Sequence, residues 1–301
     1  MLNLQQTTRQ LQYAFDLENP VCKDLNTPTN DVVKVVTPRG DFALKLYTVT
    51  PRDEIQWEID LLLHLLKYDA PVVRPIKGKR GYLNTFIIGN KKQIGVLFEW
   101  AAGEKPKDSH DTYTFIGKAA AQIHQAADTF SSSLAHTKYD ADYLIDEQLE
   151  RMHPVLIETR QLQRFTDLTD HLRNIISNPA LDYGICHMDL KSDNIHIDNG
   201  KLTVFDFNSS GKSWRAIEPY RIRKLSEGYF SAWLEGYRSV RPFGEADEKA
   251  VAAFAILGDI RSIAWDLGLA ISSRGKPLLK ADDLPKVMDG WLKWERDKIA
   301  S

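Results

Sequence analysis

The sequence predicts an α+β protein built in two parts, and three observations carry that prediction. The chain has 301 residues, about twice the length of a typical domain. Near residue 100 the pattern changes, because strand signals around one helix give way to helical periodicity. The helical part is interrupted by one short hairpin at 184–207. Apolar residues make up 43% of the chain, so a folded core is expected rather than disorder.

In the first part, residues 31–47 predict a hairpin, because two β-rich runs flank the turn sequence Pro-Arg-Gly-Asp. Apolar residues of the second run alternate onto one face, which puts Lys45 on the other. A helix begun by Pro51 is predicted over 52–67. The remaining predicted elements are strands at 82–88 and 93–100, a connector at 99–103, a helix from about 112, two helices in 142–177, and helices through 221–301.

Glu58 falls inside the apolar arc of the helix predicted over 52–67. An acidic residue in such an arc usually has a cationic partner. Lys45 is the nearest candidate in the sequence, although a solvated lysine on a half-exposed sheet is the alternative for Lys45 alone. Glu54, at the edge of the same arc, is the alternative partner.

The densest polar cluster lies at 184–208. A two-residue turn at Asn199-Gly200 would place Asn194 opposite Phe205, so that Asn194 and Asp206 meet at the open end of a hairpin. Asp189 precedes Asn194 by five residues. Asp and Asn oxygens gathered at one loop end suit a hard cation such as Mg²⁺, and a further carboxylate can accept a hydroxyl proton. A polar turn with local hydrogen bonds is the other interpretation.

This chain resembles the protein-kinase-like superfamily, and within it the aminoglycoside phosphotransferase and choline kinase group. The resemblance covers roughly residues 26–270, and its most specific part is the segment HMDLKSDN with the later VFDFN. The matching motifs are HMDLKSDN at 187–194, VFDFN at 204–208, FALKLY at 42–47, EIDLLLHL at 58–65, GVLFEWAAG at 95–103 and IGKAAAQIHQ at 116–125.

The resemblance implies a two-lobed fold with a small antiparallel-sheet N-lobe at 1–98, a hinge at 99–103 and a larger helical C-lobe at 104–301. It also implies transfer of the γ-phosphate of ATP to a hydroxyl. The implied roles are Asp189 as catalytic base with Lys191 at the γ-phosphate, Asn194 and Asp206 as Mg²⁺ ligands, Lys45 on the nucleotide phosphates with Glu58 as its partner, backbone groups of Glu99 and Ala101 on the adenine, Asn30 in the phosphate loop, and His187 as a brace for the catalytic loop.

Two segments depart from the family pattern. The loop before the strand at 31–36 reads DLNTPTNDVV and holds no glycine, and only Asn30 fits the family's loop. Glu218-Pro219 stands where Asp-Leu is expected, so Glu218 is the residue expected to brace the catalytic loop. The intact Lys, Asp, Asn and Asp set favours an active enzyme, whereas the glycine-free loop favours an inactive pseudokinase that only binds. A protein Ser/Thr kinase of the same group is the remaining alternative.

The acceptor is predicted to be a small molecule: an amino alcohol, an aminoglycoside or a hydroxy amino acid. Asp259, flanked by apolar residues, is the best acidic candidate for binding a cationic acceptor, and most aromatic residues of the C-terminal helices are expected in the core. Lys plus Arg total 39 and Asp plus Glu 41, which argues against a nucleic-acid partner. Cys22 and Cys186 lack metal-ligand spacing. With no signal peptide and no apolar run near the ~18 residues of a membrane span, a cytoplasmic protein is expected, of undefined oligomeric state.

Overall fold

The computed structural model describes residues 2–25, 27, 30–271 and 280–299. The chain divides into two compact units, each formed from three segments. Unit 1 contains Met1–Lys107, Gln125–His136 and Lys191–Ser209, and unit 2 contains Asp108–His124, Thr137–Leu190 and Ser210–Ser301. The boundaries predicted at 98 and 103 stay a prediction.

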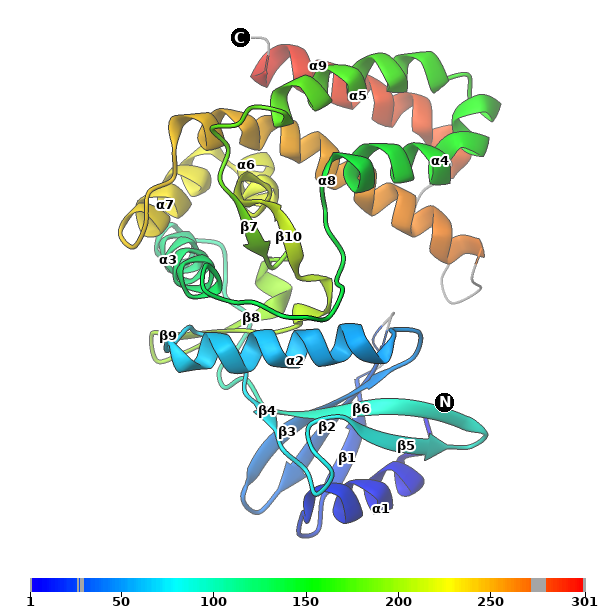
Figure 1. The fold of residues 1–301 in the computed structure, drawn as a ribbon, viewed down its shortest axis with the longest axis vertical. Coiled ribbons are helices and arrows are strands. Elements are labelled where there is room, and N and C mark those ends of the chain that lie inside the picture. Colours follow the sequence, from blue (N-terminus) through cyan, green and yellow to red (C-terminus); the bar gives the residue numbers. More distant parts are fainter. Residues whose placement is uncertain (1, 26, 28–29, 272–279, 300–301) are drawn as a thin grey trace. The chain divides into compact units, whose positions relative to one another are not determined.

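Unit 1 is built on an antiparallel sheet of strand order β1-β2-β3-β6-β4, in which β5 also pairs with β6. Helices α1 and α2 lie on opposite sides of this sheet (Figure 1). The elements of this sheet layer are α1 (Leu4–Phe15), β1 (Val21–Asp24), β2 (Asp31–Thr37), β3 (Gly40–Tyr47), α2 (Arg52–Lys67), β4 (Pro75–Ile76), β5 (Asn84–Ile88) and β6 (Lys91–Glu99). The predicted hairpin at 31–47 and the helix at 52–67 are confirmed.

The alternation predicted for β3 is also confirmed. Leu44 and Leu46 are fully buried in a core that includes Leu11 of α1 and Phe86 of β5. Lys45 therefore points to the other face of the sheet, the face on which α2 lies. The sequence analysis did not predict α1 and β1. Helix α1 is fixed to β5 partly by Gln10, whose side-chain amide hydrogen-bonds the backbone of Ile87.

The hairpin at the end of unit 1 has the predicted register. Strands β8 (Ile195–Asp198) and β9 (Lys201–Val204) pair Ile195 with Val204. Asn199 and Gly200 both have positive φ, at 47° and 78°, as a tight two-residue turn requires. Beyond the last pair, the Phe205 N–H donates to the Asn194 carbonyl at 3.0 Å. Asn194 and Asp206 thus come together at the open end of the hairpin.

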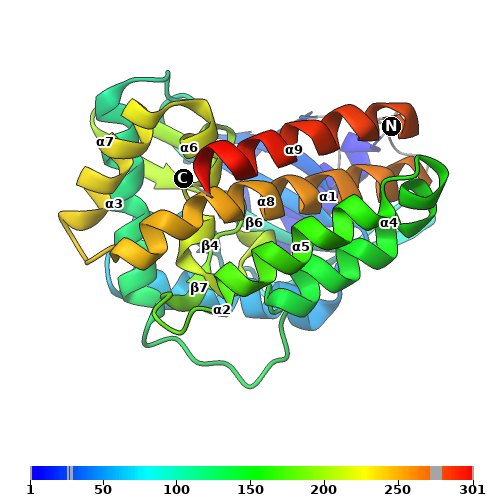
Figure 2. The ribbon, with the colours of Figure 1, turned by 90° about the horizontal axis from the view of Figure 1, so that it is seen from above.

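Unit 2 is mainly helical, and its long helix α8 packs against α4, α5, α6 and α9. Figure 2 shows α4, α5, α8 and α9 running side by side. A small antiparallel pair, β7 with β10, was not predicted in full, because β10 gives only a short sequence signal. The elements are α3 (His110–Ala127), a π-helical turn (Asp142–Asp146), α4 (Glu147–Glu158), α5 (Leu162–Ile176), β7 (Tyr183–Cys186), β10 (Gly211–Trp214), α6 (Tyr220–Leu225), α7 (Glu227–Arg238), α8 (Glu245–Ile271) and α9 (Leu284–Lys298).

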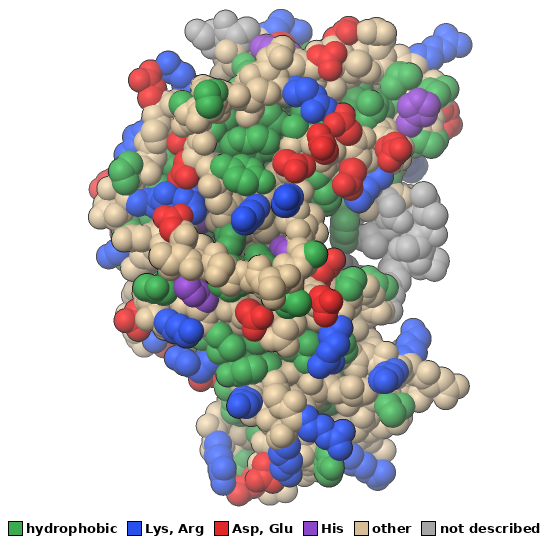
Figure 3. Space-filling view, viewed as in Figure 1, with side chains coloured by type: hydrophobic (Ala, Val, Ile, Leu, Met, Phe, Trp, Pro, Cys, Tyr) green, Lys and Arg blue, Asp and Glu red, His purple; other side chains and the backbone are tan. Residues whose placement is uncertain are grey.

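The α+β fold is therefore confirmed, with an antiparallel sheet early in the chain and helices later. In the described part of the chain, no helix combines the length and the apolar character needed to cross a membrane. Charged side chains of both signs are interspersed on the face drawn in Figure 3, as the near-balanced composition implies.

Candidate functional site

Unit 1 brings together three of the predicted site residues. Lys45 Nζ lies 3.7 Å from a Glu58 carboxylate oxygen and 2.6 Å from Asp206 Oδ1. The side chains of Lys45 and Glu58 are 9% and 4% exposed, whereas that of Asp206 is 43% exposed. The predicted partnership of Lys45 with Glu58 is confirmed, and Glu54 is not needed as the alternative.

The charge balance of this cluster keeps the lysine protonated. Burial alone would lower the pKa of Lys45, but Asp206 and Glu58 outweigh burial and raise the pKa above its ordinary value. Tyr47, on the same face of β3, donates its hydroxyl proton to Glu58 at 2.8 Å. Burial and the neighbouring Glu58 hold the pKa of Tyr47 well above its ordinary range, so this hydroxyl remains a donor.

Asp206 has a φ of 67°, a left-handed conformation that is uncommon for a residue other than glycine. This turn directs the chain out of the Phe205 position at the hairpin end, where Asn194 also lies. Asn194 is 6% exposed, and it closes a single 3₁₀ turn begun at Ser192. The pair offers carboxylate and amide oxygens, the donor set that a hard divalent cation such as Mg²⁺ prefers, and therefore fits that ion.

The predicted adenine contacts lie at the end of β6. The Glu99 N–H donates to the Arg74 carbonyl at 2.9 Å, so an adenine amino group would have to use the Glu99 carbonyl. The Ala101 carbonyl accepts from His196 Nδ1 at 2.7 Å, so the Ala101 N–H is the group the prediction requires. Asn30 is buried and its carbonyl accepts from the Thr27 hydroxyl. The rest of the predicted phosphate loop lies partly outside the described residues, at 26, 28 and 29.

Asp189 belongs to unit 2, and it lies in the loop after β7. Its backbone N–H donates to His187 Nδ1 at 3.3 Å, and His187 is 1% exposed. His187 is therefore a buried brace, as predicted. Arg221 Nη2 of α6 lies 3.6 Å from Asp189 Oδ1. Lys191, two residues after Asp189, is extended and begins the unit 1 segment that leads into the 3₁₀ turn.

Glu218 supports the backbone between these residues. It is 4% exposed, and its Oε1 accepts the Met188 N–H at 3.1 Å, one residue before Asp189. Burial alone would raise the pKa of Glu218, but His124, His187 and the Met188 N–H outweigh it and lower the pKa below its ordinary value. An ionised Glu218 thus does what was expected of it, in place of the family's Asp.

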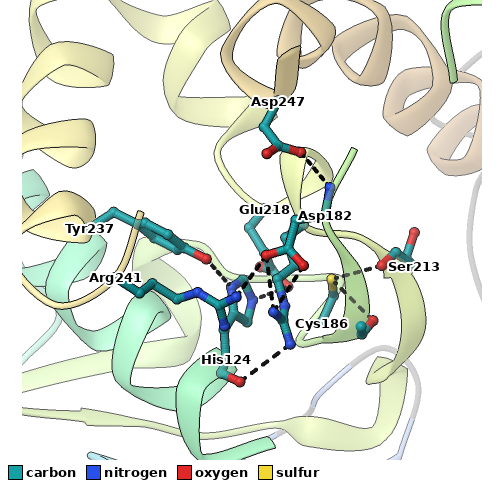
Figure 4. A network of polar contacts seen from close by, with 10 residues as sticks. His124, Asp182, Cys186, Ser213, Glu218, Tyr237, Arg241 and Asp247 are labelled. Carbon is teal, nitrogen blue, oxygen red and sulfur yellow. Dashed lines mark hydrogen bonds and ion pairs between the residues drawn. The ribbon is translucent and has the colours of Figure 1, made fainter. Parts of the chain in front are cut away.

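A network of buried polar groups surrounds Glu218 (Figure 4). His124 Nε2 lies 3.9 Å from Glu218 Oε1, and His124 Nδ1 is 2.8 Å from the Tyr237 hydroxyl. Burial lowers the pKa of His124, so the ring is neutral at pH 7. Arg215, 2% exposed, forms a forked ion pair with Asp182 at 3.0 and 3.2 Å. This pairing is what makes a buried arginine tolerable.

Three of these buried groups, in His124, Cys186 and Glu218, have potential ligand atoms within 4.8 Å of one another. Their contacts do not fit a metal. The Cys186 thiol donates to the carbonyls of Gly184 and Ser213, and burial holds its pKa well above the ordinary value. Because a thiol must lose its proton to bind a metal, this cluster is a hydrogen-bonded core.

The candidates for acceptor binding in unit 2 are largely committed to other contacts. Asp259 accepts from Lys224 and from Trp291 Nε1 at 3.3 Å. Trp233 and Tyr237 are fully buried, as core aromatics were expected to be. A cavity of about 280 Å³ lies beside Asp259, between α6, α8 and α9. The residue that sequence analysis missed here is Arg221, whose nearness to Asp189 leaves no local pattern.

Comparison with known proteins gives the same picture. The family model APH, described as "Phosphotransferase enzyme family", matches residues 28–248. A homoserine kinase of Neisseria meningitidis serogroup B is 25% identical over 235 residues, covering 74% of each chain. The structure of amicoumacin kinase hAmiN in complex with AMP-PNP, Ca²⁺ and Ami has a TM-score of 0.76 at 16% identity, covering 99% of this chain and 94% of the other. The structure of a microcompartment-associated aminopropanol kinase has a TM-score of 0.70 at 19% identity, covering 94% and 98%.

Proposed function

Because the chain belongs to the phosphotransferase enzyme family, we propose that it transfers the γ-phosphate of ATP, with Mg²⁺, to a hydroxyl of a small molecule. The observation that carries the proposal is the buried Lys45–Glu58 pair, which is joined to Asp206 in unit 1. A charged lysine held by two carboxylates is costly to bury, and a bound phosphate gives that cost a function.

In this proposal Lys45 binds the nucleotide phosphates while Glu58 orients it. Asn194 and Asp206 would hold Mg²⁺, which when bound neutralises charge on the phosphates. The backbones of Glu99 and Ala101 would pair with the adenine, Asn30 would lie at the phosphate loop, and Lys191 would reach the γ-phosphate. Kinases among the relatives, one of them solved with AMP-PNP and Ca²⁺, support a nucleotide and a divalent cation.

Asp189 is proposed as the base. The acceptor oxygen forms a bond to the γ-phosphorus, the bond from that phosphorus to the bridging oxygen of ADP breaks, and the hydroxyl proton passes to the Asp189 carboxylate. Glu218 and His187 act on Asp189 only through the backbone of the loop. They are therefore positioning residues.

The experiment is a thermal unfolding series with ATP and Mg²⁺, followed by an assay of transfer from γ-labelled ATP to a panel of hydroxyl compounds. At a ligand concentration of a hundred dissociation constants, binding stabilises the native state by about 2.7 kcal/mol. We expect this Mg²⁺-dependent shift in the wild type and its loss in Asp206→Ala. Asp189→Ala should keep the shift and lose transfer.

The matched control is Asp193→Ala. Asp193 lies in the same segment as Asn194, but it is 59% exposed and pairs with Lys105. This variant should keep both the shift and the transfer. Transfer by Asp189→Ala at the wild-type rate would contradict the proposal. A shift without transfer to any hydroxyl compound would instead identify a nucleotide-binding module.

A further inference from the structure

Arg221 is the charged side chain of α6 that lies beside the proposed base. Its Nη2 is 3.6 Å from Asp189 Oδ1, a separation that gives attraction without a formed hydrogen bond. Its Nε is buried, and among the described residues it has no hydrogen-bond partner. The side chain is nonetheless 39% exposed. Arg221 therefore keeps a guanidinium edge with an unused donor next to the group that would bind the acceptor hydroxyl.

The neighbouring cation has a different task. Arg261 of α8 donates from Nη2 to the Met188 carbonyl at 2.7 Å and stacks over the Tyr139 ring at 5.5 Å. Arg261 thereby fixes the loop one residue before Asp189. Two arginines next to one carboxylate make the electrostatic field around Asp189 more positive than a site for a polycationic acceptor would require.

The acidic groups that would attract a cationic acceptor are neutralised within unit 2. Asp259 is paired with Lys224 of the same helix α6, and Glu218 is 4% exposed and bound to the loop backbone. Glu227 pairs with Arg223 at 3.2 Å and with Lys298 at 2.9 Å. Thus the nearby acids have cations of their own, whereas Arg221 retains unused donor capacity.

From these contacts we propose that Arg221 binds a carboxylate of the acceptor, so that the substrate class is a small hydroxy acid or hydroxy amino acid. The inference rests on the proposed phosphotransfer and narrows its acceptor. A guanidinium binds a carboxylate through two parallel N–H···O bonds. Since Asp189 and Arg221 are 3.6 Å apart, hydroxyl and carboxylate must be close together, about two or three carbon atoms apart on the acceptor.

The test uses matched acceptors that differ only in the carboxylate: serine with ethanolamine, threonine with 1-aminopropan-2-ol, and homoserine with 3-aminopropan-1-ol. 4-Hydroxybutyrate, which has the carboxylate and lacks the amine, is added. The kcat/KM for phosphate transfer is measured for each compound with the wild type, Arg221→Gln and Arg221→Lys. The control variant is Arg223→Gln, since Arg223 lies on the same helix and pairs with Glu227.

We expect the wild type to prefer the acid in at least one pair by about 10- to 100-fold. Arg221→Gln should remove that preference by lowering kcat/KM for the acid alone, Arg221→Lys should keep part of it, and Arg223→Gln should keep all of it. A wild type that prefers the amines or amino sugars overturns the inference and leaves the proposed function standing. So does an Arg221→Gln variant that lowers both members of a pair equally, because Arg221 would then only position Asp189. Absence of transfer to every compound overturns both.

Discussion

Replacing Lys45 by methionine tests whether the buried cluster of unit 1 is held by charge pairing. The variant Lys45→Met keeps an unbranched side chain of similar length but removes the cation from between Glu58 and Asp206. Glu58, with 4% of its side chain exposed, would keep the Tyr47 hydroxyl as a donor at 2.8 Å. Asp206 is 43% exposed and can be solvated instead. The cost therefore falls on Glu58.

The magnitude follows from that burial. Removing one partner of a buried ion pair costs about 3–5 kcal/mol, whereas an exposed pair is worth about 0–1 kcal/mol. In the Glu58→Gln background, Lys45→Met no longer leaves a buried carboxylate without a cation. There we expect a cost of about 1–2 kcal/mol, so that the two substitutions couple by about 2 kcal/mol.

The assay is urea unfolding of the four proteins of this cycle, followed by tryptophan fluorescence. The control is Lys34→Met, because Lys34 on β2 pairs with Asp41 at 2.9 Å while both side chains are about a third exposed. With a slope of about 2 kcal/mol per molar urea, Lys45→Met should lower the midpoint by about 2 M and Lys34→Met by about 0.5 M. Equal midpoint shifts for the two variants, or additive costs in the cycle, would refute the reasoning.

Three further predictions concern unit 2. Glu218→Gln should lower the rate of phosphate transfer and cost about 2 kcal/mol of stability, since a charged hydrogen bond to a buried N–H is weakened; single-turnover rates and urea unfolding measure the two effects. Because burial lowers the pKa of His124 below 6.5, the unfolded state binds a proton that the native state does not. The unfolding free energy should then fall by up to about 1.4 kcal/mol per pH unit below pH 6.5, and His124→Gln should flatten that slope. Gly184→Ala should destabilise by several kcal/mol, because its Cβ would lie 2.8 Å from Cζ of the buried Arg215, whereas Gly228→Ala, with 3.6 Å to its nearest neighbour, should be neutral or stabilising by thermal unfolding.

The sequence predicted those parts of the site that depend on local periodicity. Alternation in β3 put Lys45 opposite the core, and the helical arc of α2 put Glu58 on its inner side, so their pairing needed only that the two elements pack. The Asn199-Gly200 turn set the register that joins Asn194 to Phe205. In each case the geometry of one element fixes the position of the side chain.

The parts that were not predicted depend on pairing between distant segments. Strand β1 has few apolar residues and is defined by its pairing with β2, and β10 by its pairing with β7. Helix α1 is half polar along its length, and two glutamine side chains attach it to β5 and the turn after it. Such contacts leave no period in the sequence from which they could be inferred.

The acceptor site shows this limit most clearly. Helix α6 carries three cations within six residues, and in sequence they look alike. Each has a different acidic neighbour: Arg223 pairs with Glu227, Lys224 with Asp259, and Arg221 lies near Asp189. The first two cations are neutralised by carboxylates that have no proposed role in transfer, so they stabilise unit 2. The third faces the proposed base and has a buried donor without a partner, so only this cation is placed to select the acceptor by charge.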